Sequence, residues 1–273
     1  LCFWIKKIIM CGISGYIGKE VINPKVIKKT LGLMRNRGPD ANGSYNFFDK
    51  KNDLNVNLLH TRLGIIDLEK RSNQPFTDGD LTIIFNGEIY NYLEIKKKLL
   101  LKKEVKFKTN SDTEVLLKAY KVFGINFFDE LEGMWSFAIW DNKKKNLLLS
   151  RDRFSEKPLY VFQDRDGIYF GSEIKYLKSL SQKKFKINEG HLVRYLFQGY
   201  KSLYKYDSTF YENVENFPNA SFSIINKKLK LKYKKYWKLK FKSKKMSFNY
   251  AVNQTKKIIL KKFKQKFRSD VPM

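Results

Sequence analysis

Strand-like segments come in closely spaced pairs in this sequence, and this order constrains the fold more than any other feature. Met134 to Trp140 and Asn146 to Ser150 flank the polar run 141–145, which predicts a hairpin. Leu159 to Phe162 and Ile168 to Phe170 flank an Asp-Gly turn and predict a second hairpin. Helical patterns occupy separate blocks. The order therefore favours an α+β fold, with antiparallel sheets covered by helices, over a parallel sheet built from βαβ units.

The other elements follow from the spacing of apolar residues and from Gly, Pro and capping residues. Further strands are expected at Cys11 to Ile17, Val56 to Ile66 and Leu81 to Phe85, with a loop over 35–43. Helices are expected from Pro24 through the apolar position Met34, and at Tyr92 to Leu101, Thr113 to Phe123, Ser172 to Leu180 and His191 to Phe197. After Trp237 the pattern changes to a basic helix, roughly Asn249 to Phe267, which predicts a domain boundary near Trp237.

Cys11 is the candidate nucleophile. It follows Met10, and the only other cysteine, Cys2, lies in the leader formed by residues 1–10. Once Met10 is removed, the α-amino group of Cys11, with an ordinary pKa of about 7.7–8.0, can act as the base for its own thiol. The leader lacks a secretory signal pattern, so it is interpreted as an upstream extension of the reading frame or as a pro-segment.

Four other residues could complete a site around a thiol. Asn86 and Gly87 end a predicted strand, where a side-chain amide and a backbone N–H could stabilise an oxyanion, although Asn-Gly also marks ordinary turns. Arg62 lies in an apolar strand and would need an anion such as a carboxylate. Asp112 starts a helix, either as a cap or as the partner of an ammonium group. A cation and an anion beside a thiol could bind both ends of an α-amino acid.

An ordered series of motifs resembles the glutaminase domain of glutamine-dependent asparagine synthetases, which are class II glutamine amidotransferases. The motifs are Met10 to Gly15, Arg35 to Asp40, the Arg62 strand, Asn86 to Asn91, Ser111 to Glu114, Gly133 to Ala138, Ser150 to Arg153, Pro158 to Tyr160 and Gly171 to Lys175. Each motif is weak alone, but the ordered set is specific. The resemblance implies the four-layer αββα fold of N-terminal-nucleophile hydrolases, with two stacked antiparallel sheets between helices.

The resemblance also implies a role for each site residue. Cys11 would attack the side-chain amide of glutamine, and Asn86 and Gly87 would hold the oxyanion. Arg62 would bind the α-carboxylate of glutamine. The remaining substrate contacts would come from Glu88 and Asp112, which bind the α-ammonium group, and from backbone near Leu63 and Ile65.

The same resemblance divides the chain into the leader, a glutaminase domain over 11–237, and the start of an ATP-dependent synthetase domain over 238–273. The glutaminase domain would need no cofactor. ATP and Mg²⁺ would serve the synthetase domain, where ammonia converts aspartate to asparagine. The sequence ends before the Ser-Gly-Gly loop that binds pyrophosphate in the family, so it is expected to lack synthetase activity. A homodimer is one possible oligomeric state, and the sequence leaves this question open.

Two positions depart from the family pattern. Asn36 stands where the family usually has histidine, in a loop expected to close over glutamine. Ser155 stands where the family usually has glycine, and it would be strained if that position needs a positive φ.

Composition limits the rival interpretations. The formal net charge is +28, and residues 221–270 hold 18 Lys or Arg and one acid, so a basic binding module without catalytic activity is an alternative. These charges alternate with apolar positions, which favours solvated faces and no nucleic-acid partner.

Two cysteines and no spanning apolar run favour a cytoplasmic protein without a membrane partner. His60 and His191 are the only histidines, so no metal site is expected. Another alternative is an amidotransferase that acts on a sugar or another carboxylate.

Overall fold

The structure is a computed structural model that describes residues 10–102, 105–203 and 208–272. The leader residues 1–9, and with them Cys2, lie outside the described residues. The chain forms two compact units. The sheet unit comprises Leu1–Leu63, Asn73–Gly87 and Met134–Lys235, and the helical unit comprises Gly64–Ser72, Glu88–Gly133 and Tyr236–Met273.

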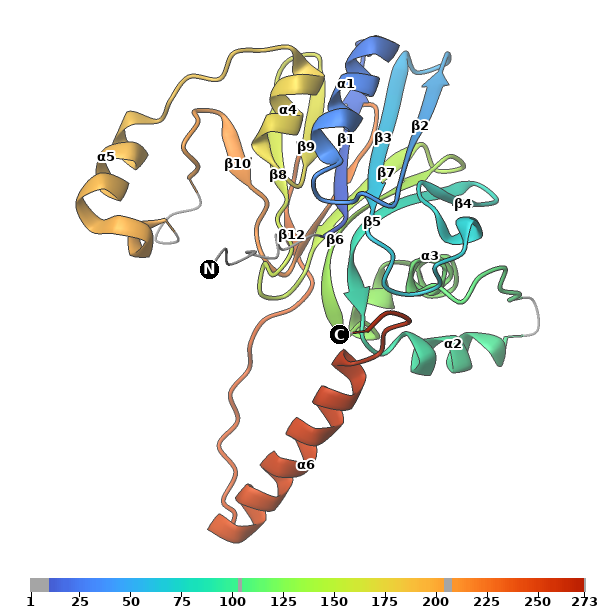
Figure 1. Ribbon diagram of the computed structural model, residues 1–273, viewed down its shortest axis with the longest axis vertical. Helices are drawn as coiled ribbons and strands as arrows, with labels where there is room; N and C mark the ends of the chain where they lie inside the picture. Colours follow the sequence, from blue (N-terminus) through green and yellow to red (C-terminus); the bar gives the residue numbers. More distant parts are fainter. Residues whose placement is uncertain (1–9, 103–104, 204–207, 273) are drawn as a thin grey trace, which may run out of the picture. The chain divides into compact units, whose positions relative to one another are not determined.

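Two six-stranded antiparallel sheets make up most of the sheet unit (Figure 1). The first has the order β10-β8-β9-β1-β3-β2, with β1 at Gly12–Gly18, β2 at Ala41–Asp49, β3 at Leu54–Arg62, β8 at Tyr160–Gln163, β9 at Gly167–Gly171 and β10 at Val214–Asn216. The second has the order β12-β11-β7-β6-β5-β4, with β4 at Phe76–Asp78, β5 at Leu81–Ile89, β6 at Gly133–Asp141, β7 at Asn146–Arg151, β11 at Ser221–Ile225 and β12 at Lys234–Lys235.

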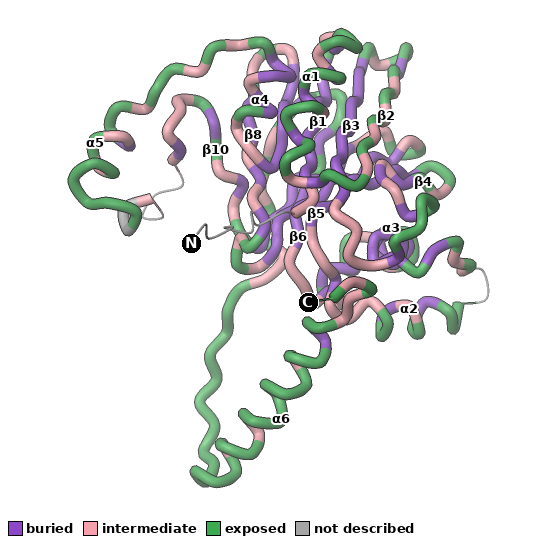
Figure 2. The backbone as a smooth tube through the Cα atoms, in the orientation of Figure 1, coloured by how far each residue is buried: buried purple, intermediate pink, exposed green. Residues whose placement is uncertain are grey.

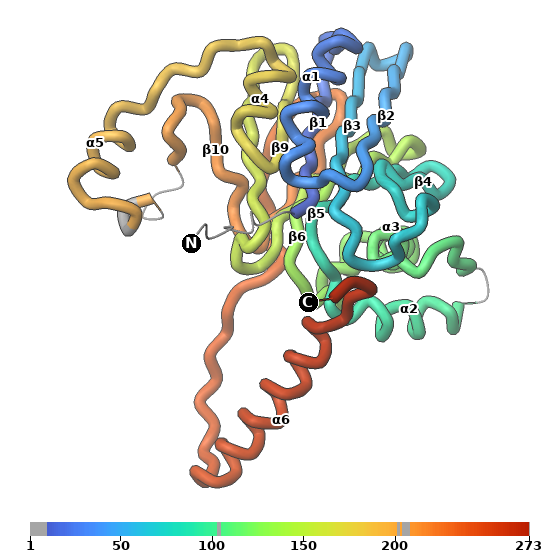
Figure 3. The backbone as a smooth tube through the Cα atoms, in the orientation of Figure 1, coloured from blue at the N-terminus to red at the C-terminus, as the bar shows by residue number. Residues whose placement is uncertain are grey.

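Both predicted hairpins are confirmed. Asp141 pairs with Asn146 at the end of the β6–β7 hairpin, and Gln163 pairs with Ile168 at the end of the β8–β9 hairpin. The chain path in Figure 3 shows β1 between β9 and β3, with antiparallel pairing on both sides. The first strand of the chain is therefore held in the middle of a sheet.

The period of two along β1 explains why the unit has layers. Ile13 and Ile17 point between the sheets, where they join a buried cluster with Val56 of β3 and Trp140 of β6. Tyr16 points to the opposite face and packs in a second cluster under two helices. Each large apolar side chain buried in this way contributes roughly 1.5–3 kcal/mol of transfer free energy.

Helices α1 (Pro24–Met34) and α4 (Ile174–Ser181) cover the outer face of the first sheet, side by side in Figure 1. Asn23 caps α1, because its side chain accepts a hydrogen bond from the N–H of Lys25 at 2.8 Å, and Pro24 occupies the first turn. Helix α5 (Glu189–Gln198) and the 3₁₀ helix η3 (Gly199–Ser202) complete the unit. The helices predicted at the positions of α1, α4 and α5 are confirmed.

The helical unit contains α2 (Tyr92–Leu100), α3 (Asp112–Phe123) and α6 (Phe248–Lys266), with the 3₁₀ helices η1 (Lys70–Ser72) and η2 (Gly124–Asp129). Helices α2 and α3 pack against each other. Ser111 caps α3 by accepting from the N–H of Glu114. Helix α6 is exposed along most of its length, and Gln265 is its one buried residue (Figure 2). The three helices agree with the predictions.

Two expectations were wrong at strand boundaries. The predicted loop over 35–43 ends in β2, which pairs with β3 along its whole length. Its Gly, Asn and Ser residues resemble a loop, but β2 is an edge strand whose side chains alternate between exposed and half-buried. The strand expected to reach Ile66 stops at Arg62, so Leu63 and Ile65 lie beyond β3.

Ser155 adopts the left-handed conformation, with φ of 59°. We expect Ser155→Gly to raise the free energy of unfolding by about 0.5–1 kcal/mol, because glycine adopts this conformation without a Cβ clash. Urea denaturation measures the change. Ser44→Gly in β2 is the control and should lower the same quantity, because glycine weakens a strand. Equal losses in both variants would contradict strain at Ser155.

Candidate active site

Cys11 lies immediately before β1, and its half-buried thiol contacts the end of β3. The N–H of Leu63 donates to Sγ at 3.3 Å, and the thiol reaches the carbonyl oxygen of Leu63 at 3.5 Å. Gly12 pairs with Thr61, so the antiparallel register sets Cys11 beside Arg62, the last residue of β3. The two strand ends thus fix the position of the sulfur.

Arg37 orients the backbone of Cys11 and was missing from the candidates taken from the sequence. Its Nε donates to the carbonyl oxygen of Cys11 at 3.0 Å, and its Nη1 contacts Glu173 at 3.3 Å. Its Nη2 is buried and makes no hydrogen bond to any described residue. The signal was present in the sequence, since Arg37 belongs to the Arg35 to Asp40 motif.

Arg62 is buried, and its Nη1 donates to Oδ1 of Asn73 at 2.8 Å. His60, two residues earlier, shares its face of β3, and its Nε2 lies 3.1 Å from the carbonyl oxygen of Phe85. The pKa of His60 is lowered to about 3, mainly by burial and in part by the nearby charge of Arg62. His60 is therefore neutral at physiological pH, and it connects β3 to β5 as a structural residue.

Asn86 is the next residue after Phe85 on β5. The N–H of Phe85 donates to Oε1 of Gln74 at 2.6 Å, a second contact that holds this part of the strand. The Asn86 side chain is 1% exposed, and its Nδ2 has no hydrogen-bond partner among the described residues. A buried donor without an acceptor costs about 1–3 kcal/mol, so this amide is suited to an oxygen brought by a ligand.

Gly87 is required by close packing of the second sheet. A Cβ at this position would lie 2.1 Å from the carbonyl oxygen of Met134 and 2.8 Å from Cα of Trp135. Both atoms are backbone atoms of β6, so no side chain could be accommodated. The packing of β6 is a sufficient reason for glycine here, whatever its backbone N–H binds.

The helical unit holds the other candidates, Ile65, Glu88 and Asp112. Asp112 is the first residue of α3 but not its cap. Its Oδ2 accepts the N–H of Ile89 at 3.0 Å. The pKa of Asp112 is raised to about 7, mainly by burial and in part by the negative charge of Glu88. Two carboxyl groups that disfavour each other's charge are suited to a shared cation.

The candidates thus fall in two groups. The sheet unit holds Cys11, Arg62, Leu63, Asn86 and Gly87, and the helical unit holds Ile65, Glu88 and Asp112. Along the chain the groups are adjacent, because Glu88 follows Gly87 and Ile65 follows Leu63 by two residues.

Residues 10–102, 105–203 and 208–272 contain no group of three or more His, Cys, Asp and Glu side chains arranged to hold a metal ion. Within the same ranges, every helix falls short of the length and apolarity that crossing a bilayer requires.

Comparison with known families then gives a direct result: residues 10–237 match the model of the glutamine amidotransferase domain. The chain belongs to the glutamine amidotransferase family. The resemblance inferred from the motifs is therefore confirmed for this domain.

Curated relatives of this amidotransferase domain include several synthetases. A putative glutamine-hydrolysing asparagine synthetase 2 of Methanocaldococcus jannaschii is 35% identical over 288 residues, covering 97% of this chain and 53% of the relative. Asparagine synthetase 1 of Bacillus subtilis is 34% identical, covering 97% and 41%. Amidase chry2 of Gibberella zeae is 32% identical, covering 85% and 35%. The chain thus spans about half or less of the length of these relatives.

Solved structures support the fold. Glutamine phosphoribosylpyrophosphate amidotransferase from Bacillus subtilis, in complex with ADP and GMP, matches with a TM-score of 0.60 and 18% identity, covering 83% of this chain and 49% of that one. The stacked antiparallel sheets and this similarity confirm the predicted α+β fold class, with two antiparallel sheets and covering helices.

Proposed function

We propose that this domain hydrolyses the side-chain amide of glutamine, with Cys11 as the nucleophile. The observation that carries the proposal is the position of the Cys11 thiol. Cys11 lies immediately before β1, and the N–H of Leu63 donates to its Sγ at 3.3 Å. Family membership supports glutamine as the substrate. Removal of Met10 is part of the proposal, because only a terminal Cys11 has a free α-amino group.

The reaction then proceeds in two steps. The α-amino group of Cys11 takes the thiol proton, and the sulfur attacks the amide carbon of glutamine. The tetrahedral oxyanion is stabilised by Nδ2 of Asn86 and the N–H of Gly87. The proton passes to the leaving nitrogen, ammonia departs, and a thioester remains. Water attacks the thioester, which releases glutamate and restores the thiol.

Five residues are assigned roles in glutamine binding. Arg62 binds the α-carboxylate of glutamine, in keeping with its buried guanidinium group. Glu88 and Asp112 bind the α-ammonium group, in keeping with the mutual repulsion of their negative charges. Backbone near Leu63 and Ile65 supplies the remaining contacts.

The test uses the protein with Cys11 as its first residue. It is incubated with glutamine, and glutamate and ammonia are measured in parallel. Equal amounts of both products are expected, with a Michaelis dependence on glutamine. Absence of both products from folded protein with a verified Cys11 terminus would refute the proposed function. Salt-dependent retention on DNA by such an inactive protein would favour the basic binding module instead.

Asp112→Asn should weaken glutamine binding while stabilising the empty protein. The Michaelis constant for glutamine should rise by about 100-fold or more, because the ammonium group loses a buried charged partner. In the wild type, the same constant should rise as the pH falls below about 7, where Asp112 becomes protonated.

The stability effect of Asp112→Asn has a definite sign. The folded-state pKa of Asp112 is raised above the ordinary 3.8, so its stabilising contribution is complete below pH 3.8 and is lost as the pH rises through about 7. Thermal unfolding at pH 8 should show a gain of about 1–3 kcal/mol for the variant, and at pH 4 little change. Asp141→Asn is the control, since its carboxylate accepts the N–H of Lys144, and it should leave the Michaelis constant unchanged. An unchanged constant in Asp112→Asn would remove Asp112 from the site.

For the whole protein we propose a glutamine-dependent asparagine synthetase, in which residues 238–273 begin the ATP-dependent domain. The synthetase relatives, which are longer than this chain, support it, and so do exposed apolar residues of α6 such as Ile259 and Phe263. The sequence contains no Ser-Gly-Gly loop, so ATP and Mg²⁺ are assigned to no residue of this chain. An acceptor other than aspartate is the second candidate, favoured by the relatives named as amidases. To test which acceptor is used, the protein purified from its source is incubated with glutamine, ATP and either aspartate, a sugar or another carboxylate. Asparagine, formed from aspartate, is the expected product.

A further inference from the structure

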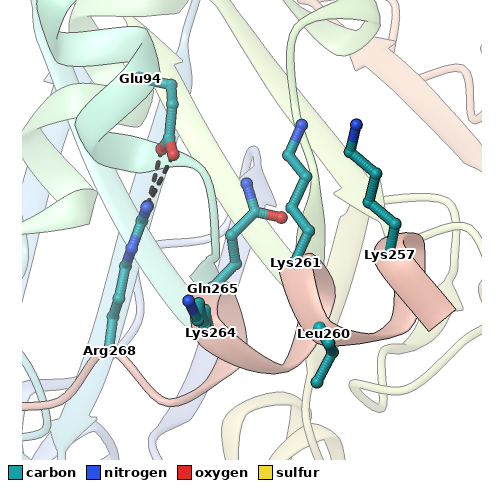
Figure 4. A pocket seen from close by; sticks show the side chains of 7 residues that line it. All are labelled: Glu94, Lys257, Leu260, Lys261, Lys264, Gln265 and Arg268. Atoms are coloured by element: carbon teal, nitrogen blue, oxygen red, sulfur yellow. Dashed lines mark hydrogen bonds and ion pairs between the residues drawn. The ribbon is translucent and has the colours of Figure 1, made fainter.

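The segment 268–272 follows α6 and is fixed to the helical unit by the side chain of Arg268. Its Nη1 and Nη2 donate to the two carboxylate oxygens of Glu94 at 2.6 and 2.7 Å, the bidentate pair drawn in Figure 4. Nη1 also donates to the carbonyl oxygen of Tyr90 at 2.8 Å. The guanidinium group holds the pKa of Glu94 at about 2. Arg268 thereby fixes the start of the segment beside the first turn of α2.

Asp270 makes two further contacts, both with residues just beyond β3. Its backbone N–H donates to the carbonyl oxygen of Ile65 at 2.9 Å, and its Oδ2 accepts the N–H of Asp67 at 2.7 Å. One residue therefore holds both ends of the tripeptide 65–67. Asp67 has φ of 50°, a left-handed conformation that an aspartate tolerates but does not prefer. The bond from Asp270 stabilises that conformation.

Asp67 extends the connection to α3. Its buried Oδ2 accepts the N–H of Asn110 at 2.7 Å, two residues before Asp112. Hydrogen bonds to its carboxylate, together with the charge of Arg71, hold its pKa below the ordinary range. Asp67 thus links the segment 65–67 to Asn110, and Asp270 holds Asp67. The linked segments contain or adjoin Ile65 and Asp112, which are assigned above to glutamine binding.

We propose that Asp270 is a positioning residue for glutamine binding: its N–H and carboxylate fix the 65–67 backbone, and through Asp67 they fix the start of α3. This inference rests on the proposed glutaminase function. It gives a part in substrate recognition to a segment more than 200 positions along the chain from Asp67, although Asp270 itself touches no substrate.

The test compares Asp270→Ala with Asp270→Asn in the protein that begins at Cys11. Alanine removes the acceptor for the N–H of Asp67, whereas asparagine retains a neutral acceptor. The Michaelis constant for glutamine should rise by about 3- to 10-fold in the alanine variant, as expected for a charged hydrogen bond at an exposed residue, and less in the asparagine variant. The kcat should change by less than about twofold, because the chemistry at Cys11 is untouched.

A second measurement does not require turnover. Iodoacetamide alkylates Cys11, and bound glutamate should protect it. The glutamate concentration for half-protection should rise by the same factor as the Michaelis constant, while the unprotected alkylation rate stays constant. Ser269→Ala is the matched control, because among the residues that the structure describes the Ser269 hydroxyl bonds to Val271 of the same segment, and it should change neither quantity.

The outcomes separate the two proposals. A wild-type protein that releases no glutamate refutes the glutaminase function, while half-protection still reports whether Asp270 governs binding. An active wild type with unchanged Michaelis and half-protection constants in Asp270→Ala overturns the positioning role. A lower melting temperature with reduced kcat and an unchanged Michaelis constant would also overturn it, because that pattern is a loss of folded protein.

Discussion

Replacing Cys11 with alanine should reduce glutamate release by about 10⁴-fold or more, which is the loss expected when a covalent nucleophile is removed. No other described residue is placed to form the thioester in the proposed reaction. The rate is measured with the protein that begins at residue 11, at saturating glutamine. The variant should still bind glutamine, because Arg62, Glu88 and Asp112 are intact, and calorimetric titration measures this binding.

The fold of the Cys11→Ala variant should be preserved. The thiol is half-buried and loses its contacts with Leu63, so the free energy of unfolding should fall by about 1 kcal/mol. Glutamate release at the wild-type rate by Cys11→Ala would show that another group is the nucleophile, and the assignment of Cys11 would be wrong.

Asn86→Ala should lower kcat by about 10²- to 10³-fold with little change in the Michaelis constant, because Nδ2 acts on charge that develops only in the transition state. The free energy of unfolding of this variant should rise or stay constant. The amide is buried and its Nδ2 has no partner among the described residues, so its removal relieves an unfavourable burial.

Asn55 on β3 offers the matched comparison. It is also a buried asparagine, but its Nδ2 donates to the carbonyl oxygen of Lys19 at 3.1 Å. Asn55→Ala should therefore lower the melting temperature and leave kcat unchanged, the opposite pattern to Asn86→Ala. Measurement of kcat and of the melting temperature in both variants distinguishes the roles. If kcat of Asn86→Ala equals that of the wild type, Asn86 does not stabilise the oxyanion.

Much of the fold could be predicted from local patterns, because local interactions specify it. The turn at Asp141 to Lys145 and the start of α1 at Pro24 each depend on residues adjacent in the chain, and both predictions were right. Strand β2 was missed because its own residues do not favour a strand. It forms because β3 provides an unpaired edge, which no window around residue 41 can reveal.

The candidate site was likewise predictable where local sequence specifies it and not where it depends on the folded sheet. Cys11 and Asn86 could be proposed from their own chemistry and their place beside predicted strands. The contact of Arg37 with the carbonyl oxygen of Cys11 joins residues 26 positions apart and depends on the folded sheet. The sequence left Asp112 open as a cap or a cation ligand, and the structure excludes the cap, because Ser111 occupies that position. What could not be predicted was which residues meet, since that is set by packing.

The division of the chain into two units has a consequence for how such a protein can be altered genetically. The polypeptide passes from one unit to the other after Leu63, Ser72, Gly87, Gly133 and Lys235. No single deletion or recombination point can therefore separate the unit bearing the nucleophile from the unit bearing Glu88 and Asp112. The two must be inherited, duplicated or lost together, and any shuffling of this module between genes has to move it whole.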